Sequence, residues 1–258
     1  MENSGAGSSI ATKTRWRTPE NFFPIVVDDF FSNPEELVKL GKSLPKGISG
    51  VQPGLRSKQL SEIEPSLNDT ILKKILSCHY DLNYVSLSWQ ASNMCFHEIG
   101  RFSENKNDIR NKGWIHQDGK VTVAGLIYLT PDIDPDSGTS LWTLKPNVEI
   151  KTHADSYYDQ QKRSWCLEDG TPSNGEEYTQ DYLEQQESLT EKFRFLNVFN
   201  RMIMYDSAEW HGANSYYHED GKDPRLTLAF FIVGIESDIG YGGPKSEYPL
   251  KRVKSYYI

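Results

Sequence analysis

The sequence predicts an α+β fold that is mainly β, in which N-terminal helices back a barrel or double sheet of short strands. One observation is the aromatic content, 12% of 258 residues, because β-sheets favour such side chains. Another is a change of pattern near residue 82, after which strand-like stretches separated by Gly, Pro and Asp replace helical ones. No internal repeat is visible, so residues 15–258 are expected to form one domain.

The N-terminal part predicts two helices. Residues 1–14 are rich in Ser, Gly and Thr and are expected to form a flexible tail. Residues 22–31 predict a strand that leads into a turn. Residues 32–44 predict a helix, because the opening letters SNPEE supply capping side chains, a first-turn proline and two acids. Residues 47–60 look like a loop, whereas residues 66–80 carry the apolar stripe of a second helix.

The later part of the chain predicts a series of strands rich in aromatic and β-branched residues. They cover residues 84–99, 121–131, 139–144, 193–206 and 225–235. Residues 145–192 between them are polar, and the stretch 176–192 is expected to be partly helical. A connection of that length in a compact domain is usually functional or mobile, so we interpret it as a surface insertion and a candidate lid.

Composition excludes several classes of protein. The net charge of -8 argues against a chain that binds nucleic acid through its overall charge. The three cysteines form no CxxC pair, which gives no support to a structural zinc site and favours reduced thiols. Neither a signal peptide nor an apolar run of ~20 residues is present. We therefore expect a cytoplasmic protein that does not cross a membrane.

The stretch GWIHQDG, residues 113–119, holds a histidine and an aspartate two positions apart. On a β-strand such residues project to the same face, so His116 and Asp118 would present a nitrogen and an oxygen ligand together. Two ligands make a weak metal site. A second histidine from elsewhere would complete the arrangement of two histidines and one carboxylate that is typical of non-haem Fe(II) sites.

Among the other histidines, His211 is the best candidate for the third ligand. It follows a predicted strand, at a point where the chain has just left the sheet. His79 at a helix end is interpreted as structural or exposed, and His153 and His218 as solvated. His97 lies on the strand before the motif, where it either points into the barrel or is a hydrogen-bonded core residue.

The order of these residues resembles a known superfamily. His116-Gln117-Asp118, then His211, then Arg225-Leu226-Thr227 is similar to the HxD…H…RxS/T pattern of the Fe(II)/2-oxoglutarate-dependent dioxygenases. The segments IYLT (127–130) and DSGTSLW (136–142) resemble stretches of its prolyl-hydroxylase-like members. VVDDFFSNPEEL and PGLRS resemble the beginning of phage and bacterial oxygenases, mostly of unassigned substrate. The resemblance covers roughly residues 23–236.

The resemblance implies a double-stranded β-helix core of the jelly-roll or cupin type, within a single oxygenase domain. It also implies Fe(II), the cosubstrate 2-oxoglutarate and O2, with release of succinate and CO2 and, by default, hydroxylation of a C–H bond. The metal ligands would be His116, Asp118 and His211. Arg225 would clamp the distal carboxylate of 2-oxoglutarate, with hydroxyl donors from Thr227 and Tyr128.

Three departures from the prolyl-hydroxylase pattern leave the substrate class open. His97 stands where those enzymes usually carry a tyrosine, Thr227 replaces a serine, and Ser137-Gly138 replaces a Gly-Gly pair. None removes a metal ligand. The presence of Asp118 disfavours halogenation, since the related halogenases lack the carboxylate ligand. A small-molecule or peptide substrate is expected, and the oligomeric state is open.

Two other hypotheses remain at this stage. The aromatic richness is also compatible with a non-enzymatic β-sandwich or cupin-like module that binds a sugar or a peptide. A cupin metalloenzyme that does not use 2-oxoglutarate would keep the metal ligands but would have no need of Arg225.

Overall fold

The computed structural model describes residues 24–47, 53–80, 82, 86–118, 121, 123–146, 148 and 183–237. The predicted tail over residues 1–14, most of the insertion over 145–192, and His153 lie outside these residues. Where the end of the insertion is described, residues 183–188 are helical. Within the described ranges, no helix combines the length and apolar character needed to span a bilayer.

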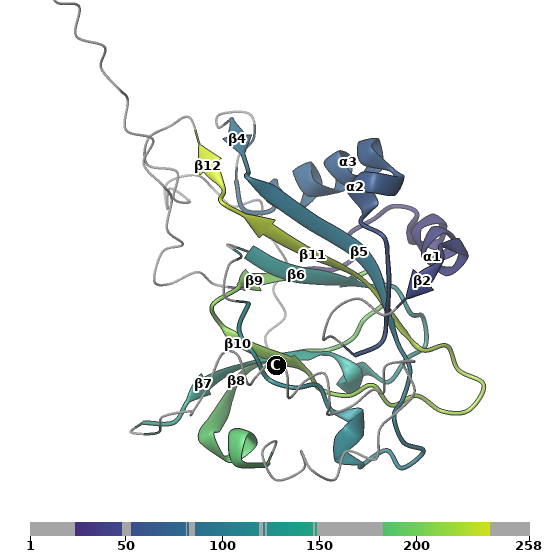
Figure 1. The fold of residues 1–258 in the computed structure, drawn as a ribbon, viewed down its shortest axis with the longest axis vertical. Coiled ribbons are helices and arrows are strands. Elements are labelled where there is room, and N and C mark those ends of the chain that lie inside the picture. Colours follow the sequence, from purple (N-terminus) through teal and green to yellow (C-terminus); the bar gives the residue numbers. More distant parts are fainter. Residues whose placement is uncertain are drawn as a thin grey trace, which may run out of the picture.

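Three helices and three short strands make up the N-terminal part (Figure 1). They are β1 (Ile25–Val27), α1 (Pro34–Ser43), β2 (Lys46–Gly47), β3 (Leu55–Ser57), α2 (Leu60–Ile63) and α3 (Pro65–Leu76). Helix α1 begins after Asn33, with Pro34 in its first turn, although the Asn33 side chain makes no capping hydrogen bond. The predicted second helix ends at Leu76 rather than at residue 80 and is preceded by the one-turn helix α2.

The rest of the described chain is mainly β, as the sequence predicts. Its strands are β4 (Leu87–Ser88), β5 (Ala91–Ile99), β6 (Val123–Tyr128), β7 (Thr139–Leu144), β8 (Leu189–Phe195), β9 (Met202–Asp206), β10 (Trp210–Ala213), β11 (Arg225–Val233) and β12 (Glu236–Ser237). A seven-stranded sheet has the order β1-β9-β6-β11-β5-β3-β2, and a three-stranded sheet has the order β10-β7-β8. Every strand pair in them is antiparallel.

One face of the large sheet packs against the helices, which lie together on that side in Figure 1. Alternate residues of the central strands, such as Phe96, Leu228 and Phe230, join Leu72 and Ile75 of α3 in the main hydrophobic cluster. Because side chains alternate between faces along a strand, the residues between them face the opposite way. The helices therefore occupy one face and leave the other to the small sheet.

The other face of the large sheet turns toward strands β7, β8 and β10, which lie on the far side from the helices (Figure 1). A second hydrophobic cluster joins the sheets: Tyr128 and Ile203 of the large sheet pack with Leu141 and Phe195 of the small one. Polar residues on this inner face are therefore held between two sheets, away from bulk water.

The structure corrects two expectations about the strands. Residues 193–206 were expected to form one strand, but β8 and β9 belong to different sheets. The chain turns between them at Asn200, whose φ of 62° is tolerated by asparagine and whose side chain hydrogen-bonds to both backbone groups of Phe31. Residues 47–60 were expected to be a loop, but they contain β3, which pairs with β5.

A glycine lets helix α1 approach the large sheet closely. A Cβ atom added at Gly41 would lie 2.6 Å from Cδ1 and 2.9 Å from Cε1 of Phe96, a ring that is fully buried. We expect Gly41→Ala to lower the free energy of unfolding by about 1–3 kcal/mol through overpacking, despite the helix propensity of alanine. Thermal unfolding would show it as a fall of several degrees in Tm.

Gly47→Ala is the matched control, because a Cβ atom there meets nothing within 4 Å. A Gly41→Ala protein as stable as this control would contradict the close packing of α1 on Phe96.

Candidate metal centre

A cavity lies between the two sheets, with a volume of about 630 Å³ including its mouth. Strands of the large sheet supply His97, Arg225 and Thr227, while the small sheet supplies Thr139 and His211. The segment that precedes β6 adds His116 and Asp118. The structure thus brings the predicted ligands and the predicted 2-oxoglutarate arginine to one cavity.

His116 and His211 are joined by their backbones. The N–H of His116 donates to the carbonyl of His211 at 2.9 Å, and the N–H of His211 donates back at 2.8 Å. Residues that exchange both hydrogen bonds in an antiparallel pair place their side chains on the same side. The two imidazoles therefore lie together, with ring centroids 4.3 Å apart, although the residues are distant in sequence.

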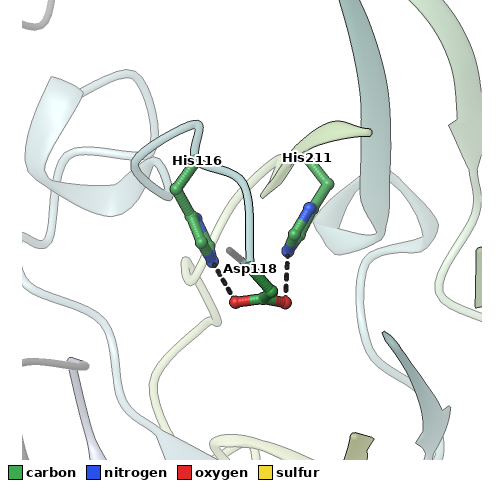
Figure 2. Close-up of side chains that lie close together, drawn as sticks. All are labelled: His116, Asp118 and His211. Carbon is green, nitrogen blue, oxygen red and sulfur yellow. Dashed lines mark ion pairs between the residues drawn. The ribbon is translucent and has the colours of Figure 1, made fainter. Parts of the chain in front are cut away.

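This pairing corrects the predicted local structure. His116 and Asp118 do not lie on a regular strand: His116 forms an isolated bridge, and the N–H of Asp118 donates to the carbonyl of Ser207. His211 has not left the sheet but belongs to β10. The expected geometry still results, because both imidazoles are directed at the Asp118 carboxylate (Figure 2). The side chain of Gln117 is exposed and donates to the Ala208 carbonyl.

Backbone carbonyls fix the orientation of both rings. Nδ1 of His116 lies 3.0 Å from the Trp114 oxygen, and Nδ1 of His211 lies 2.8 Å from the Glu209 oxygen. A carbonyl only accepts, so each Nδ1 carries a hydrogen, and in the neutral tautomer that this contact selects the lone pair is on Nε2. Burial, followed by the neighbouring His211, lowers the pKa of His116 to about 4, so this ring is neutral at physiological pH.

Asp118 provides the carboxylate at the centre of the site. Its Oδ1 lies 3.7 Å from Nε2 of His116, and its Oδ2 lies 3.2 Å from Nε2 of His211. Burial alone would raise the pKa of Asp118, but the two histidines lower it by more, which keeps the group ionised. Oδ2 is buried and has no hydrogen-bond partner among the described residues.

These three residues fit a metal ion. Three potential ligand atoms converge, with one atom of each residue within 4.8 Å of the others. A cation between the Nε2 atoms and the carboxylate would be bound by all three. Two imidazoles and one carboxylate form the donor set that suits Fe(II), with further positions open.

Arg225 lies at the start of β11, with only 3% of its surface exposed. Its Nε is 3.3 Å from the Ser137 carbonyl, its Nη2 is 3.4 Å from the Thr139 hydroxyl, and its guanidinium lies 5.5 Å from the centre of the Tyr128 ring. Within the described ranges no carboxylate pairs with it. A buried cation without a counter-ion is costly, so this end of the cavity suits an anionic group.

The family comparison matches most of the chain. The family of unknown function DUF6445 matches residues 14–232. The chain belongs to this family. No curated protein sequence matches this DUF6445 member.

Solved structures similar to this DUF6445 protein include HygX from Streptomyces hygroscopicus with nickel and 2-oxoglutarate bound. The identity is 12% over 81% of this chain and 82% of HygX, with a TM-score of 0.48. The non-heme alpha ketoglutarate dependent epimerase SnoN from nogalamycin biosynthesis is 8% identical over 81% and 78%, with a TM-score of 0.46. A Trichoplax adhaerens prolyl hydroxylase in complex with a hypoxia inducible factor peptide is 11% identical over 82% and 83%, with a TM-score of 0.37.

The two predicted hydroxyl donors of the DUF6445 protein take different positions. Tyr128 is fully buried and its hydroxyl donates to Thr139, which also contacts Arg225. Thr227 lines the cavity, but its hydroxyl bonds to the backbone carbonyl of His97 at 3.4 Å. Thr139 is thus a hydroxyl next to Arg225 that sequence reasoning did not single out, although it stands in the quoted DSGTSLW stretch.

Two further residues of the cavity, Tyr205 and Arg56, were not predicted from the sequence. Tyr205 of β9 lies with its ring 4.8 Å from that of His211, and burial, followed by Asp118, raises its pKa. Arg56 of β3 lines the cavity as well. The one signal for Arg56 was the PGLRS stretch of the family resemblance, while Tyr205 looked like any aromatic residue of a strand.

Local contacts explain several residues near the site. Arg201 forms a two-point ion pair with Asp28. Asp206 has a turn role, since its carboxylate accepts from the N–H of Ala208. Gly113 allows a close approach of two backbones, since a Cβ atom there would lie 2.7 Å from backbone atoms of Ala213.

His97 combines both roles that the sequence left open, since it lines the cavity and its Nε2 bonds to the Pro53 carbonyl at 2.7 Å. Burial, followed by the charge of Arg56, lowers its pKa to about 3. Because this value lies below the ordinary pKa of about 6.5, stability is complete above pH ~6.5 and is lost as the pH falls toward 3.

We expect His97→Gln, which keeps an N–H donor but does not titrate, to flatten this acid dependence. Between about pH 6.5 and 4.5 the wild-type chain should lose roughly 2–3 kcal/mol more than the variant. Urea unfolding of metal-free protein at both pH values measures the difference, with His218→Gln as the control. Equal losses in wild type and His97→Gln would show that His97 is accessible to protons in the folded state.

Proposed function

We propose that the protein is an Fe(II)- and 2-oxoglutarate-dependent dioxygenase that hydroxylates a C–H bond of a peptide, an amino acid or a small metabolite. The observation that carries this proposal is the presence, in one cavity, of a convergent His-Asp-His triad and a buried arginine without a counter-ion. A metal site alone fits many reactions, and a buried arginine alone fits many ligands. Together they match a cosubstrate that has a metal-binding end and a distal carboxylate.

His116, His211 and Asp118 would hold the iron in this proposal. The Nδ1–H···O=C bonds of the two histidines keep both Nε2 atoms directed at the site before metal binds, so metal binding requires little reorganisation of the rings. When bound, Fe(II) would supply redox chemistry with O2 that is coupled to decarboxylation of 2-oxoglutarate to succinate and CO2.

Arg225 would bind the distal carboxylate of 2-oxoglutarate. A guanidinium matches a carboxylate with two parallel N–H···O bonds, and its present contacts, at 3.3 and 3.4 Å, are long and readily exchanged. Tyr128 and Thr139 form a hydroxyl pair next to it. Thr227 would join them only if its hydroxyl left the His97 carbonyl.

The same proposal assigns the two facing sheets to a double-stranded β-helix and residues 15–258 to one oxygenase domain. Inner-face residues Leu126, Ala229 and Phe231 add apolar lining that limits water near the site. The lid role of residues 145–192 stays a prediction.

The first test is of the metal ligands. Anaerobic addition of Fe(II) and 2-oxoglutarate should produce a weak visible charge-transfer band, with one iron bound per chain. His116→Ala should abolish the band and weaken metal binding by at least about 100-fold, since even loss of an outer hydrogen-bond partner costs 10- to 100-fold. His218→Ala, at a histidine outside the cavity, is the control. A band of full intensity in His116→Ala would overturn the ligand assignment.

The second test is of the cosubstrate. Arg225→Gln should still bind metal but should bind 2-oxoglutarate about 30-fold or more weakly, because one partner of a buried charge pair is lost. Calorimetric titration of Zn(II)-loaded protein measures this, and Arg194→Gln, at a more exposed arginine, is the control. Unchanged affinity would favour a cupin metalloenzyme that does not use 2-oxoglutarate, whereas absence of metal binding in the wild type would favour a binding module.

Turnover is tested by release of succinate in the presence of metabolite and peptide pools. Uncoupled succinate release that depends on Fe(II) and Arg225 would support the reaction class before a substrate is known.

A further inference from the structure

Arg56 lies at the end of a row of residues that crosses the large sheet. It pairs with His97 of β5, His97 pairs with Thr227 of β11, and Thr227 pairs with Tyr128 of β6. Directly paired residues of antiparallel strands project to the same face, so all four lie on the inner face of the sheet. Arg56 therefore reaches the cavity from the side opposite to Tyr128, the ring against which Arg225 lies.

The guanidinium of Arg56 has no partner among the described residues. No hydrogen bond or ion pair of its side chain is formed there, and its Nε is buried without an acceptor. Other arginines of the described chain are paired: Arg101 with Asp220, Arg110 with Asp108, and Arg201 with Asp28. A half-buried donor group that is unsatisfied on a cavity wall indicates that its acceptor comes from a ligand.

The charges of the cavity indicate how many negative charges the ligands bring. Among the described residues of its lining, the charged side chains are Arg56, Arg225 and Asp118. His97 is neutral because burial lowers its pKa to about 3, and His116 and His211 bind the metal as neutral imidazoles, the form that ligates a metal. A divalent metal together with dianionic 2-oxoglutarate adds no net charge, so the loaded cavity keeps one positive charge in excess. That excess lies at Arg56, since Arg225 would be neutralised by 2-oxoglutarate.

We propose that Arg56 binds a carboxylate of the substrate, so that the protein oxidises a small carboxylic acid held between this arginine and the metal triad. The inference rests on the proposed function, because the charge balance assumes that metal and 2-oxoglutarate are bound. One guanidinium fork matches one carboxylate, and a single excess charge matches a monoanion better than a phosphate dianion. Ile99 and the apolar residues of the inner face provide a surface for its hydrocarbon part.

The position of Arg56 also separates it from the chemistry of the metal ligands. It lines the same cavity as Asp118 but forms no ion pair with it, whereas both histidines of the triad do. It therefore acts as a binding residue near the reacting centre rather than as a support for a ligand. Loss of Arg56 is expected to weaken substrate binding while leaving metal and 2-oxoglutarate bound.

The test uses butyrate as the probe and butyramide as its neutral match. The full chain is loaded with Zn(II), which has no redox chemistry, and with saturating 2-oxoglutarate. Arginine Nε–H signals are followed by 15N nuclear magnetic resonance, and the Arg56 signal is identified by its loss in Arg56→Gln. Butyrate should shift this signal saturably, and butyramide should not.

Variants of Arg56 complete the test. Followed through backbone amides of the cavity, Arg56→Gln should bind butyrate roughly 30-fold or more weakly, while its affinity for 2-oxoglutarate changes less than about threefold. Arg56→Lys, which keeps the charge but not the fork, should retain part of the butyrate affinity. Arg194→Gln should match the wild type.

The outcomes separate this inference from the proposed function. If 2-oxoglutarate fails to bind the Zn(II)-loaded wild type, the proposed function is wrong and the charge balance behind the inference falls with it. If 2-oxoglutarate binds but butyrate gives no saturable shift, or shifts the signal no more than butyramide does, only the carboxylate site is overturned. A loss of 2-oxoglutarate affinity in both Arg56→Gln and Arg56→Lys would assign Arg56 to the cosubstrate and would also overturn it.

Discussion

The candidate site depends on one backbone contact, the reciprocal hydrogen-bonded pair of His116 and His211. It fixes a segment that precedes β6 to strand β10 of the small sheet, and so places two imidazoles side by side from distant parts of the sequence. The N–H of Asp118 bonds to the carbonyl of Ser207 and so fixes the backbone beside the two rings, and carbonyls two residues before each histidine set the ring orientation. The second hydrophobic cluster packs the small sheet on the inner face of the large one, and this pairing then closes the triad at the cavity between them.

The two faces of the large sheet have different roles. Phe96, Leu228 and Phe230 face the helices and supply stability through burial, whereas Arg225, Thr227 and Ala229 face the cavity from alternate positions of the same strand. The buried guanidinium of Arg225 works against stability in the free protein, since its charge is desolvated without a carboxylate partner in the described chain. An anionic ligand that pairs with it would stabilise the folded state by linkage.

Periodicity and turn residues were enough to predict a mainly β fold with N-terminal helices, because strand alternation and helix-start signals are local. These local signals did not predict structure that depends on long-range strand pairing. Strand β3 lies in a stretch that looks like a loop, and β8 and β9 enter different sheets after a turn at Asn200. The triad was predictable because its spacing is characteristic. Arg56 and Thr139 could not be predicted as site residues. An arginine after a Pro-Gly pair and a threonine in a strand are common in any sequence, and only strand pairing places these two at the cavity.

The order of the site residues along the chain has a consequence for synthesis. A growing polypeptide presents His116 and Asp118 well before His211, and Arg225 follows last. Domains fold as units, so the three residues come together only after β10 has been made and has paired with the earlier segment. Under the proposed function, the full ligand set would therefore exist only in a chain whose two sheets have already formed.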